Sequence, residues 1–366
     1  MSKHYITKPI LPEFDEFSNA LFEIWGTRQL TNSGPYLKRF EKALSTYLGV
    51  ESVSTFCNGT IALMTALKAL GVKGEVITTP FTFSATVNVL DWINATPVFC
   101  DIDPDTMCID ASKIVGKITP QTTAIMPVHV YGIPCDTNAI ERIAKKHNLK
   151  VIYDGAHTFG ENITDTYSCG DATILSFHAT KMFHTIEGGG LITKDKLIDQ
   201  KGRLLKNFGI VDEDTVKLAG INGKMNEVQS IMGLMNLNLI DEELAKRSAL
   251  RAKYDEVIDD LPGVKNFSHL QKSEFYYPIK IEADQYGKTR DQLFNAFRED
   301  GIYVRKYFYP LCSEYDFFKH LPSSRKENLI VAHDVSEKIL CLPFYGDMDV
   351  DIFSKVVNIL KENLCK

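Results

Sequence analysis

Several features that would place the chain in a special class are missing. Its 366 residues include eight cysteines, but these are scattered singly and form no C-x-x-C pair. Neither a zinc site nor a disulfide framework is therefore indicated, and cysteines used in this way fit a reducing cytosol. No run approaches the roughly 18 apolar residues of a membrane span, and residues 1–20 are too charged for a secretory signal. We therefore expect a cytoplasmic protein with no metal and no membrane partner.

The chain also has no surplus of positive charge. Its formal net charge is −6, with 41 Lys and Arg residues against 47 Asp and Glu residues. Few cations are therefore free to neutralise the phosphates of a nucleic acid, and no nucleic-acid partner is expected. Internal repeats and low-complexity stretches are absent too. The apolar content of 44% and the charged content of 24% are those of an ordinary globular enzyme.

What the sequence does contain is a regular alternation of short apolar runs and helical patterns. Seven runs are expected to be strands, at residues 53–56, 75–79, 97–102, 124–130, 151–154, 172–176 and 191–193. Short buried strands that alternate with helices predict an α/β fold with a mostly parallel sheet between helices. Beyond about residue 225 a long helix is expected over 226–253, and strands become sparser. We predict a large domain over 1–245 and a smaller C-terminal α+β domain over 246–366.

One lysine, Lys181, lies where a sheet of this kind would place a reactive side chain. Lys181 follows the expected strand 172–176 and precedes the turn Glu187-Gly188-Gly189-Gly190. An amine at the end of a sheet can attack a carbonyl if its pKa is lowered, since only the free amine is a nucleophile. Taken alone, a lysine such as Lys181 is more often a solvated loop lysine.

Other strand ends supply groups that complement an amine, and ligands of open parallel sheets bind at the carboxyl ends of strands. Gly59 and Thr60 open a helix and form a natural phosphate seat, while Asp154 and Ser176 each end a strand. The ordinary alternatives are a turn glycine at a helix cap, a capping aspartate and a strand-end hydroxyl bonded to backbone.

Together, the amine and these strand-end groups suit pyridoxal 5′-phosphate. Lys181 would form the Schiff base, and Asp154 would pair with the pyridinium nitrogen so that the ring acts as an electron sink. Gly59, Thr60 and Ser176 would hold the phosphate.

The same stretches resemble the sugar aminotransferases of the DegT/StrS family, which are pyridoxal-phosphate enzymes of fold type I. The matching segments run through nearly the whole chain, from Ser33-Gly34 to Leu342-Pro343. The most specific match is the segment SFHATK at 176–181 together with Glu187-Gly188-Gly189. The resemblance implies the seven-stranded large domain and smaller C-terminal domain of that fold.

The resemblance also implies roles for five further residues. Phe81 stands where the family places an aromatic ring over the cofactor. His157 would lie near the cofactor's ring hydroxyl, where its imidazole could titrate and alter the pH profile. Asn222 would reach the phosphate in the neighbouring subunit. His129 and Tyr309 would contact the sugar, although each could also be a packing or capping residue.

The family implies an obligate homodimer with shared active sites, L-glutamate as amino donor and a nucleotide-linked keto-sugar as acceptor. The opening Ile6-Thr7-Lys8-Pro9 resembles members that aminate C4 of dTDP-4-keto-6-deoxy-D-glucose. The product would be dTDP-4-amino-4,6-dideoxyglucose, for O-antigen or another surface polysaccharide. A C3 aminotransferase acting on a dTDP-3-keto-6-deoxyhexose is the alternative.

Two other functions are compatible with the same residues but are less favoured. The family's sugar 3-dehydratases carry histidine in place of the Schiff-base lysine, so Lys181 favours an aminotransferase. A non-catalytic sensor of pyridoxal phosphate or of a sugar nucleotide is a remote alternative, because both Lys181 and Asp154 are retained.

Overall fold

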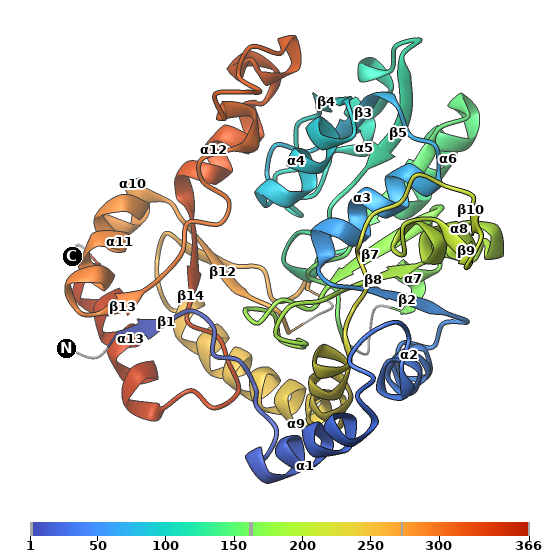
Figure 1. Ribbon diagram of the computed structural model, residues 1–366. Coiled ribbons are helices and arrows are strands. Elements are labelled where there is room, and N and C mark those ends of the chain that lie inside the picture. The colour runs from blue at the N-terminus through green and yellow to red at the C-terminus, as the bar shows by residue number, and fades with distance from the viewer. Residues whose placement is uncertain (1–2, 161–163, 272–273, 365–366) are drawn as a thin grey trace.

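The structure is a computed structural model that describes residues 3–160, 164–271 and 274–364. Two bodies lie side by side in Figure 1, a larger one around a central sheet and a smaller one formed mainly by the C-terminal part of the chain. Helix α9 (Glu227–Ile258) lies below both of them in this view. In the described part of the chain, no helix is both long and apolar enough to cross a bilayer.

The larger body is built on a seven-stranded sheet with the order β2-β8-β7-β6-β5-β3-β4. Its strands are β2 (Val53–Phe56), β3 (Gly74–Thr78), β4 (Ala95–Phe99), β5 (Thr122–Met126), β6 (Lys150–Asp154), β7 (Ala172–Ser176) and β8 (Gly189–Ile192). The neighbours from β7 to β4 are parallel, whereas β8 is antiparallel to both β2 and β7. The predicted mostly parallel sheet of seven strands is confirmed.

Successive residues of each central strand pack into different cores, because side chains alternate across a strand. On β6, Ile152 joins the core under α3 (Gly59–Ala69), whereas Val151 and Tyr153 join the core that includes α2 (Pro35–Leu48). Both faces of the sheet are therefore buried, which explains the continuous apolar runs in the sequence. The other helices of this body are α1 (Phe14–Thr27), α4 (Ser84–Trp92), α5 (Ala111–Ile114), α6 (Thr137–His147), α7 (Thr164–Tyr167) and α8 (Lys196–Leu205), with short 3-10 turns η1 (Val115–Lys117) and η2 (Val130–Gly132) and a hairpin of β9 (Ile210–Asp212) and β10 (Thr215–Val216).

The smaller body has its own sheet and core. A three-stranded antiparallel sheet has the order β11-β12-β14, formed by β11 (Val264–Asn266), β12 (Tyr277–Ile281) and β14 (Ile339–Leu342). Its helices are α10 (Ala283–Tyr286), α11 (Arg290–Glu299), α12 (Ile330–Lys338) and α13 (Val350–Glu362), with 3-10 turns η4 (Cys312–Glu314), η5 (Pro322–Ser324) and η6 (Lys326–Asn328). The N-terminal strand β1 (His4–Tyr5) pairs with β13 (Ile302–Tyr303) and so joins this body. The predicted division at residue 245 falls inside α9 and stays a prediction.

Candidate active site

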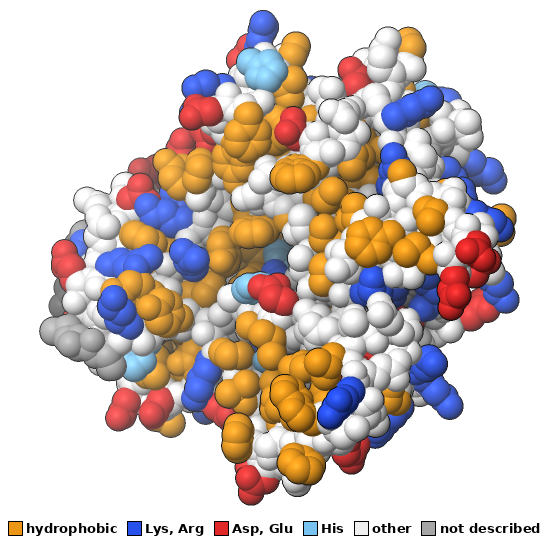
Figure 2. Space-filling model, in the orientation of Figure 1, with side chains coloured by type: hydrophobic (Ala, Val, Ile, Leu, Met, Phe, Trp, Pro, Cys, Tyr) orange, Lys and Arg blue, Asp and Glu red, His pale blue; other side chains and the backbone are white. Residues whose placement is uncertain are grey.

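A pocket of about 330 Å³ lies at the carboxyl ends of the central strands. Six of the predicted residues line it together: Gly59, Thr60, Asp154, His157, Ser176 and Lys181. Figure 2 shows a hollow near the centre of this face, between the two bodies. Residues of the smaller body, among them Tyr276 and Tyr307, complete the wall. A parallel sheet brings strand ends that are distant in sequence to one edge, and the pocket follows from that topology.

The predicted phosphate seat is formed by two segments in very close contact. The Asn58 side chain caps α3 by accepting a hydrogen bond from the Ile61 N–H at 2.8 Å. A Cβ on Gly59 would lie 3.1 Å from Ser176 Cβ, and a Cβ on Gly189 would lie 2.6 Å from the backbone of Asn58. Glycine is therefore needed where β8 crosses this loop. The start of α3 offers free N–H groups to an anion beside the hydroxyls of the pocket.

Lys181 has the lowered pKa that a nucleophilic amine needs. Its nitrogen lies 5.0 Å from the ring centroid of Phe275 and 6.0 Å from that of Tyr276. Burial among these rings disfavours the ammonium form and lowers the pKa of Lys181 to about 8, while the charge of Asp154 acts in the opposite direction. A sizeable fraction of the amine is therefore neutral near physiological pH. Lys181 differs in this respect from a solvated loop lysine.

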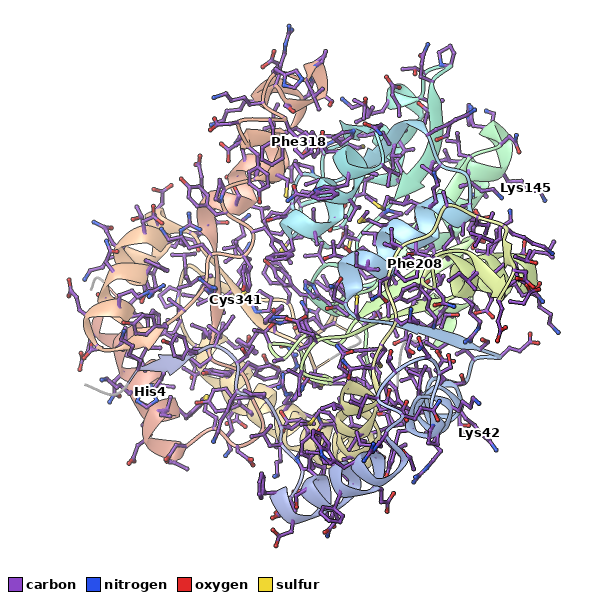
Figure 3. The ribbon with its side chains drawn as sticks, viewed as in Figure 1. His4, Lys42, Lys145, Phe208, Phe318 and Cys341 are labelled. Atoms are coloured by element: carbon purple, nitrogen blue, oxygen red, sulfur yellow. The ribbon has the colours of Figure 1, made fainter. Side chains whose placement is uncertain are left out.

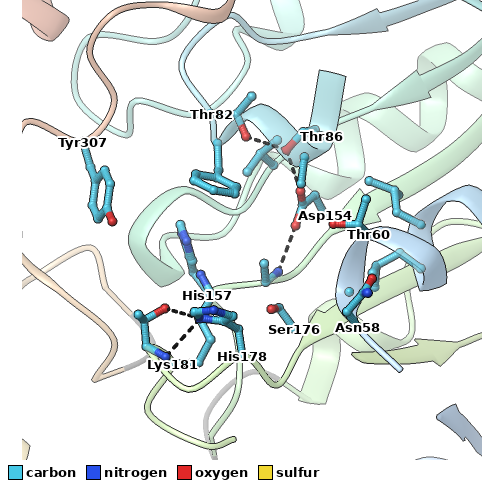
Figure 4. A pocket seen from close by; sticks show the side chains of 18 of the residues that line it. Asn58, Thr60, Thr82, Thr86, Asp154, His157, Ser176, His178, Lys181 and Tyr307 are labelled. Atoms are coloured by element: carbon cyan, nitrogen blue, oxygen red, sulfur yellow. Dashed lines mark hydrogen bonds between the residues drawn. The ribbon is translucent and has the colours of Figure 1, made fainter. Parts of the chain in front are cut away.

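The Asp154 carboxylate is held by two hydrogen bonds, shown in Figure 4. Thr86 Oγ1 donates to Oδ2 at 2.7 Å, and the Ala156 N–H donates to Oδ1 at 3.0 Å. Thr82 Oγ1 lies 2.7 Å from Thr86 Oγ1. Because a carboxylate can only accept, Thr86 must donate to Asp154, and the Thr82 hydroxyl is left to donate to Thr86. This hydroxyl chain fixes the orientation of the carboxylate in the pocket.

His157 is a neutral hydrogen-bond donor rather than a group that titrates near neutral pH. The Tyr131 N–H donates to His157 Nδ1 at 3.2 Å, which leaves the proton on Nε2. The ring of His157 is parallel to those of Tyr131 and Phe308, with centroids 6.4 and 5.9 Å away. Burial, and then the charge of Lys181, lower the pKa of His157 well below its ordinary value. The expectation that this imidazole would add a titration to the pH profile is therefore wrong.

Four other predicted site residues do not line the pocket. Phe81 and His129 are fully buried. Phe81 packs edge-on against Tyr131, and the ring of His129 stacks on Tyr153 with centroids 4.9 Å apart. The structure therefore does not place Phe81 at the cofactor or His129 at the sugar, because both side chains are enclosed in the core and neither lines the pocket.

The other two predicted residues outside the pocket are exposed. Tyr309 lies under the Arg290 guanidinium, and Asn222 lies in the loop before α9. Neither side chain is enclosed in the core, so each could still meet a substrate or a second subunit. The roles of Tyr309 and Asn222 stay predictions.

Sequence reasoning missed several pocket residues. Thr82 and Thr86 have no distinctive signal, since threonines at a helix start are usually caps. His178, Glu187, Arg305, Tyr307 and Phe308 line the pocket as well. His178 Nε2 lies 3.3 Å from Glu187 Oε1 at its edge. Three of them, Arg305, Tyr307 and Phe308, come from the smaller body, more than a hundred positions after the strand ends. No local pattern could reveal that contact.

One residue outside the pocket connects the two loops that form it. Gln229, in the first turn of α9, donates from Nε2 to the carbonyl of Cys57 at 3.2 Å and to that of Glu187 at 2.6 Å. Its Oε1 accepts from the Asn226 N–H at 3.0 Å. The amide therefore ties the phosphate loop to the loop that follows the lysine. The amine, carboxylate, hydroxyls and helix start in this one pocket fit pyridoxal phosphate.

The comparisons with known proteins agree with this geometry. The DegT/DnrJ/EryC1/StrS aminotransferase family matches residues 13–361. A dTDP-4-amino-4,6-dideoxy-D-glucose transaminase of Shigella dysenteriae is 45% identical over 363 residues, which are 98% of each chain. A protein of the same name from Escherichia coli is 41% identical and covers 97% of each chain.

Solved structures are similar over almost the whole chain. DesI, crystallised in the presence of its TDP-sugar product, superposes with a TM-score of 0.93 at 30% identity, covering 99% of this chain and 93% of that one. NtdA of Bacillus subtilis with bound cofactor PMP superposes with a TM-score of 0.86 at 30% identity, covering 95% and 81%.

We expect apoprotein to combine covalently with pyridoxal phosphate at a rate that rises with pH through about 8, because the Lys181 amine is mostly neutral above its pKa. Asp154→Asn removes the charge that raises this pKa, so the midpoint should move to lower pH. Absorbance after rapid mixing, measured across a pH series, gives both midpoints. Thr60→Ala is the control, since it should slow binding without moving the midpoint. A wild-type midpoint near the ordinary lysine value of 10.5 would contradict the assignment.

Proposed function

The chain belongs to the DegT/DnrJ/EryC1/StrS family and is a pyridoxal-phosphate-dependent sugar aminotransferase, and on this basis we propose that it transfers an amino group from L-glutamate to C4 of dTDP-4-keto-6-deoxy-D-glucose. The product is dTDP-4-amino-4,6-dideoxyglucose, a deoxyamino sugar suited to O-antigen or another surface polysaccharide. The observation that carries the reaction is the Lys181 amine beside Asp154 in one pocket. The names of the two bacterial transaminases support C4 over the C3 alternative. A relative named as a glutamate aminotransferase supports the donor.

Each step of the transfer depends on a proton that a side chain of this pocket holds or moves. Pyridoxal phosphate, when bound, supplies an electron-accepting ring that stabilises negative charge on the carbon next to the transferred nitrogen. Lys181 Nζ would hold the cofactor through its aldehyde and, when free, would accept the proton that the donor's α-carbon loses. Burial suits Lys181 to both tasks, because its pKa of about 8 leaves the amine able to give up and take back a proton near neutral pH.

The residues around Lys181 set the charge and orientation of the site. Asp154, held by Thr86 and the Ala156 N–H, would keep a proton on the ring nitrogen through its negative charge. His157 offers its Nε2–H as a donor at the same wall, since Nδ1 is engaged by the backbone. Gly59, Thr60 and Ser176 would hold the phosphate at the start of α3.

Incubation of the enzyme with L-glutamate and dTDP-4-keto-6-deoxy-D-glucose should give an amine at C4, identified by NMR of the product. Lys181→Ala should reduce turnover to background, because the base and the covalent anchor are both lost. Offering the 3-keto isomer in parallel is the control for position. An amine at C3, or normal turnover in Lys181→Ala, would contradict this proposal.

We also propose a homodimer in which Asn222 completes the partner's phosphate seat. Asn222 is exposed and lies outside the pocket of its own chain. The segment around it carries five large apolar side chains that are exposed: Phe208 (labelled in Figure 3), Ile210, Val211, Val216 and Ile221. An apolar group of this kind is typical of a surface that a partner covers.

Sedimentation velocity is expected to show a dimer. Val216→Asp, which places a charge in the exposed apolar segment, should shift the protein toward monomer and weaken cofactor binding. Lys217→Gln, a change at the next position, is the matched control and should sediment as the wild type does. A wild-type monomer with full cofactor affinity would refute the shared site.

A further inference from the structure

Arg305 places a positive charge in the wall of the catalytic pocket, and no acidic side chain of the described residues pairs with that charge. The other charged groups of the wall are occupied: Asp154 accepts two hydrogen bonds, Glu187 pairs with His178, and Lys181 is the reacting amine. Within residues 3–160, 164–271 and 274–364, the Arg305 guanidinium makes no hydrogen bond and no ion pair. A cation left free in a substrate pocket is available to an anionic ligand.

The backbone of Arg305 is fixed although its guanidinium is free. The Arg305 N–H donates to the carbonyl of Cys341 at 3.2 Å, and the Cys341 N–H donates back at 2.8 Å. Cys341, labelled in Figure 3, belongs to β14. The sheet of the smaller body therefore fixes the backbone from which the Arg305 side chain extends. The Arg305 guanidinium carbon lies 5.6 Å from the centroid of the Tyr307 ring. The side chain is therefore presented from a rigid element rather than a loose loop.

Arg305 lies on the substrate side of the pocket. Its neighbour Tyr307 stands opposite Asn58 and Thr60 in Figure 4, away from the start of α3. The Tyr307 ring is 5.6 Å from that of Tyr276, which in turn lies 6.0 Å from the Lys181 amine. The anion that Arg305 attracts is therefore not the one seated at α3. It belongs to a molecule that reaches the amine along this aromatic wall.

Two substrate anions could bind Arg305: the α-carboxylate of the amino donor and the diphosphate of the sugar nucleotide. The chemistry of the two substrates distinguishes between these anions, and this step rests on the function proposed above. The α-carboxylate of an amino acid is bonded to the carbon that loses its proton, so it must lie close to Lys181. The diphosphate of a sugar nucleotide is attached at C1, across the hexose ring from C4. A guanidinium matches a carboxylate with two parallel N–H donors. We propose that Arg305 binds the α-carboxylate of the amino donor and so selects amino acids for the first half of the reaction.

The next residue along the chain provides a matched control. Lys306 is also basic, but it forms an ion pair with Asp291, and its nitrogen lies 4.3 Å from the ring centroid of Phe294. Arg290 pairs with the same aspartate. Lys306 does not line the pocket. Lys306→Gln and Arg305→Gln each remove one positive charge from the protein. Only Arg305→Gln changes the proposed site.

The test is a titration of the yellow holoenzyme with L-glutamate, followed by the absorbance change that accompanies the first half-reaction. Arg305→Gln should weaken the apparent glutamate affinity roughly 10- to 100-fold, the usual worth of a hydrogen bond to a charged group. Arg305→Lys should recover part of the loss, since it restores charge without the planar fork. Lys306→Gln should titrate as the wild type does. Cofactor affinity and circular dichroism should be unchanged in all three variants.

The KM for the keto-sugar separates the two anions. In Arg305→Gln it should stay within about twofold of the wild-type value, because the donor's carboxylate has left before the sugar binds. A raised sugar KM with an unchanged glutamate titration would assign Arg305 to the diphosphate and overturn the proposal. Unchanged values for both substrates would overturn it as well. If the wild-type enzyme itself did not respond to glutamate, the proposed function would fail instead.

Discussion

Burial of a single amine at the carboxyl edge of the sheet is the constraint on which the site depends. Lys181 lies in the loop between the antiparallel strands β7 and β8, and aromatic rings of the smaller body cover its nitrogen. Desolvation lowers the pKa of the amine, while Asp154 limits how far it falls. The protein thus gives up the solvation of one ammonium group and obtains a nucleophile that is active near neutral pH.

Close backbone contact supports this arrangement. Gly189 on β8 lies against Asn58 and Gly59 with no room for a side chain, so the strand after the lysine loop abuts the phosphate seat. The Gln229 amide then joins the carbonyls of Cys57 and Glu187 from the first turn of α9. A shift of either loop would break one of these contacts. The contacts therefore hold the phosphate seat and the loop that carries the amine against each other.

Most of the large domain could be predicted from the sequence because its strands are short, buried on both faces and separated by glycines and prolines. The rule that parallel strands place ligands at their carboxyl ends was enough to group Gly59, Asp154 and Ser176 with Lys181. The failures have physical causes. His129 and Phe81 have residue types that suit a site, but the local backbone turns them into the core. Arg305 and Tyr307 reach the pocket only through domain packing, which leaves no trace in local periodicity.

Borohydride reduction of the holoenzyme, followed by peptide mapping, tests the central claim most directly. The covalent bond between the cofactor's aldehyde and the buried amine would be made permanent, and its position can then be read from the modified peptide. We predict that the pyridoxyl group is found on Lys181 alone. A label on another lysine, or protein that binds the cofactor without any reducible bond, would contradict the account.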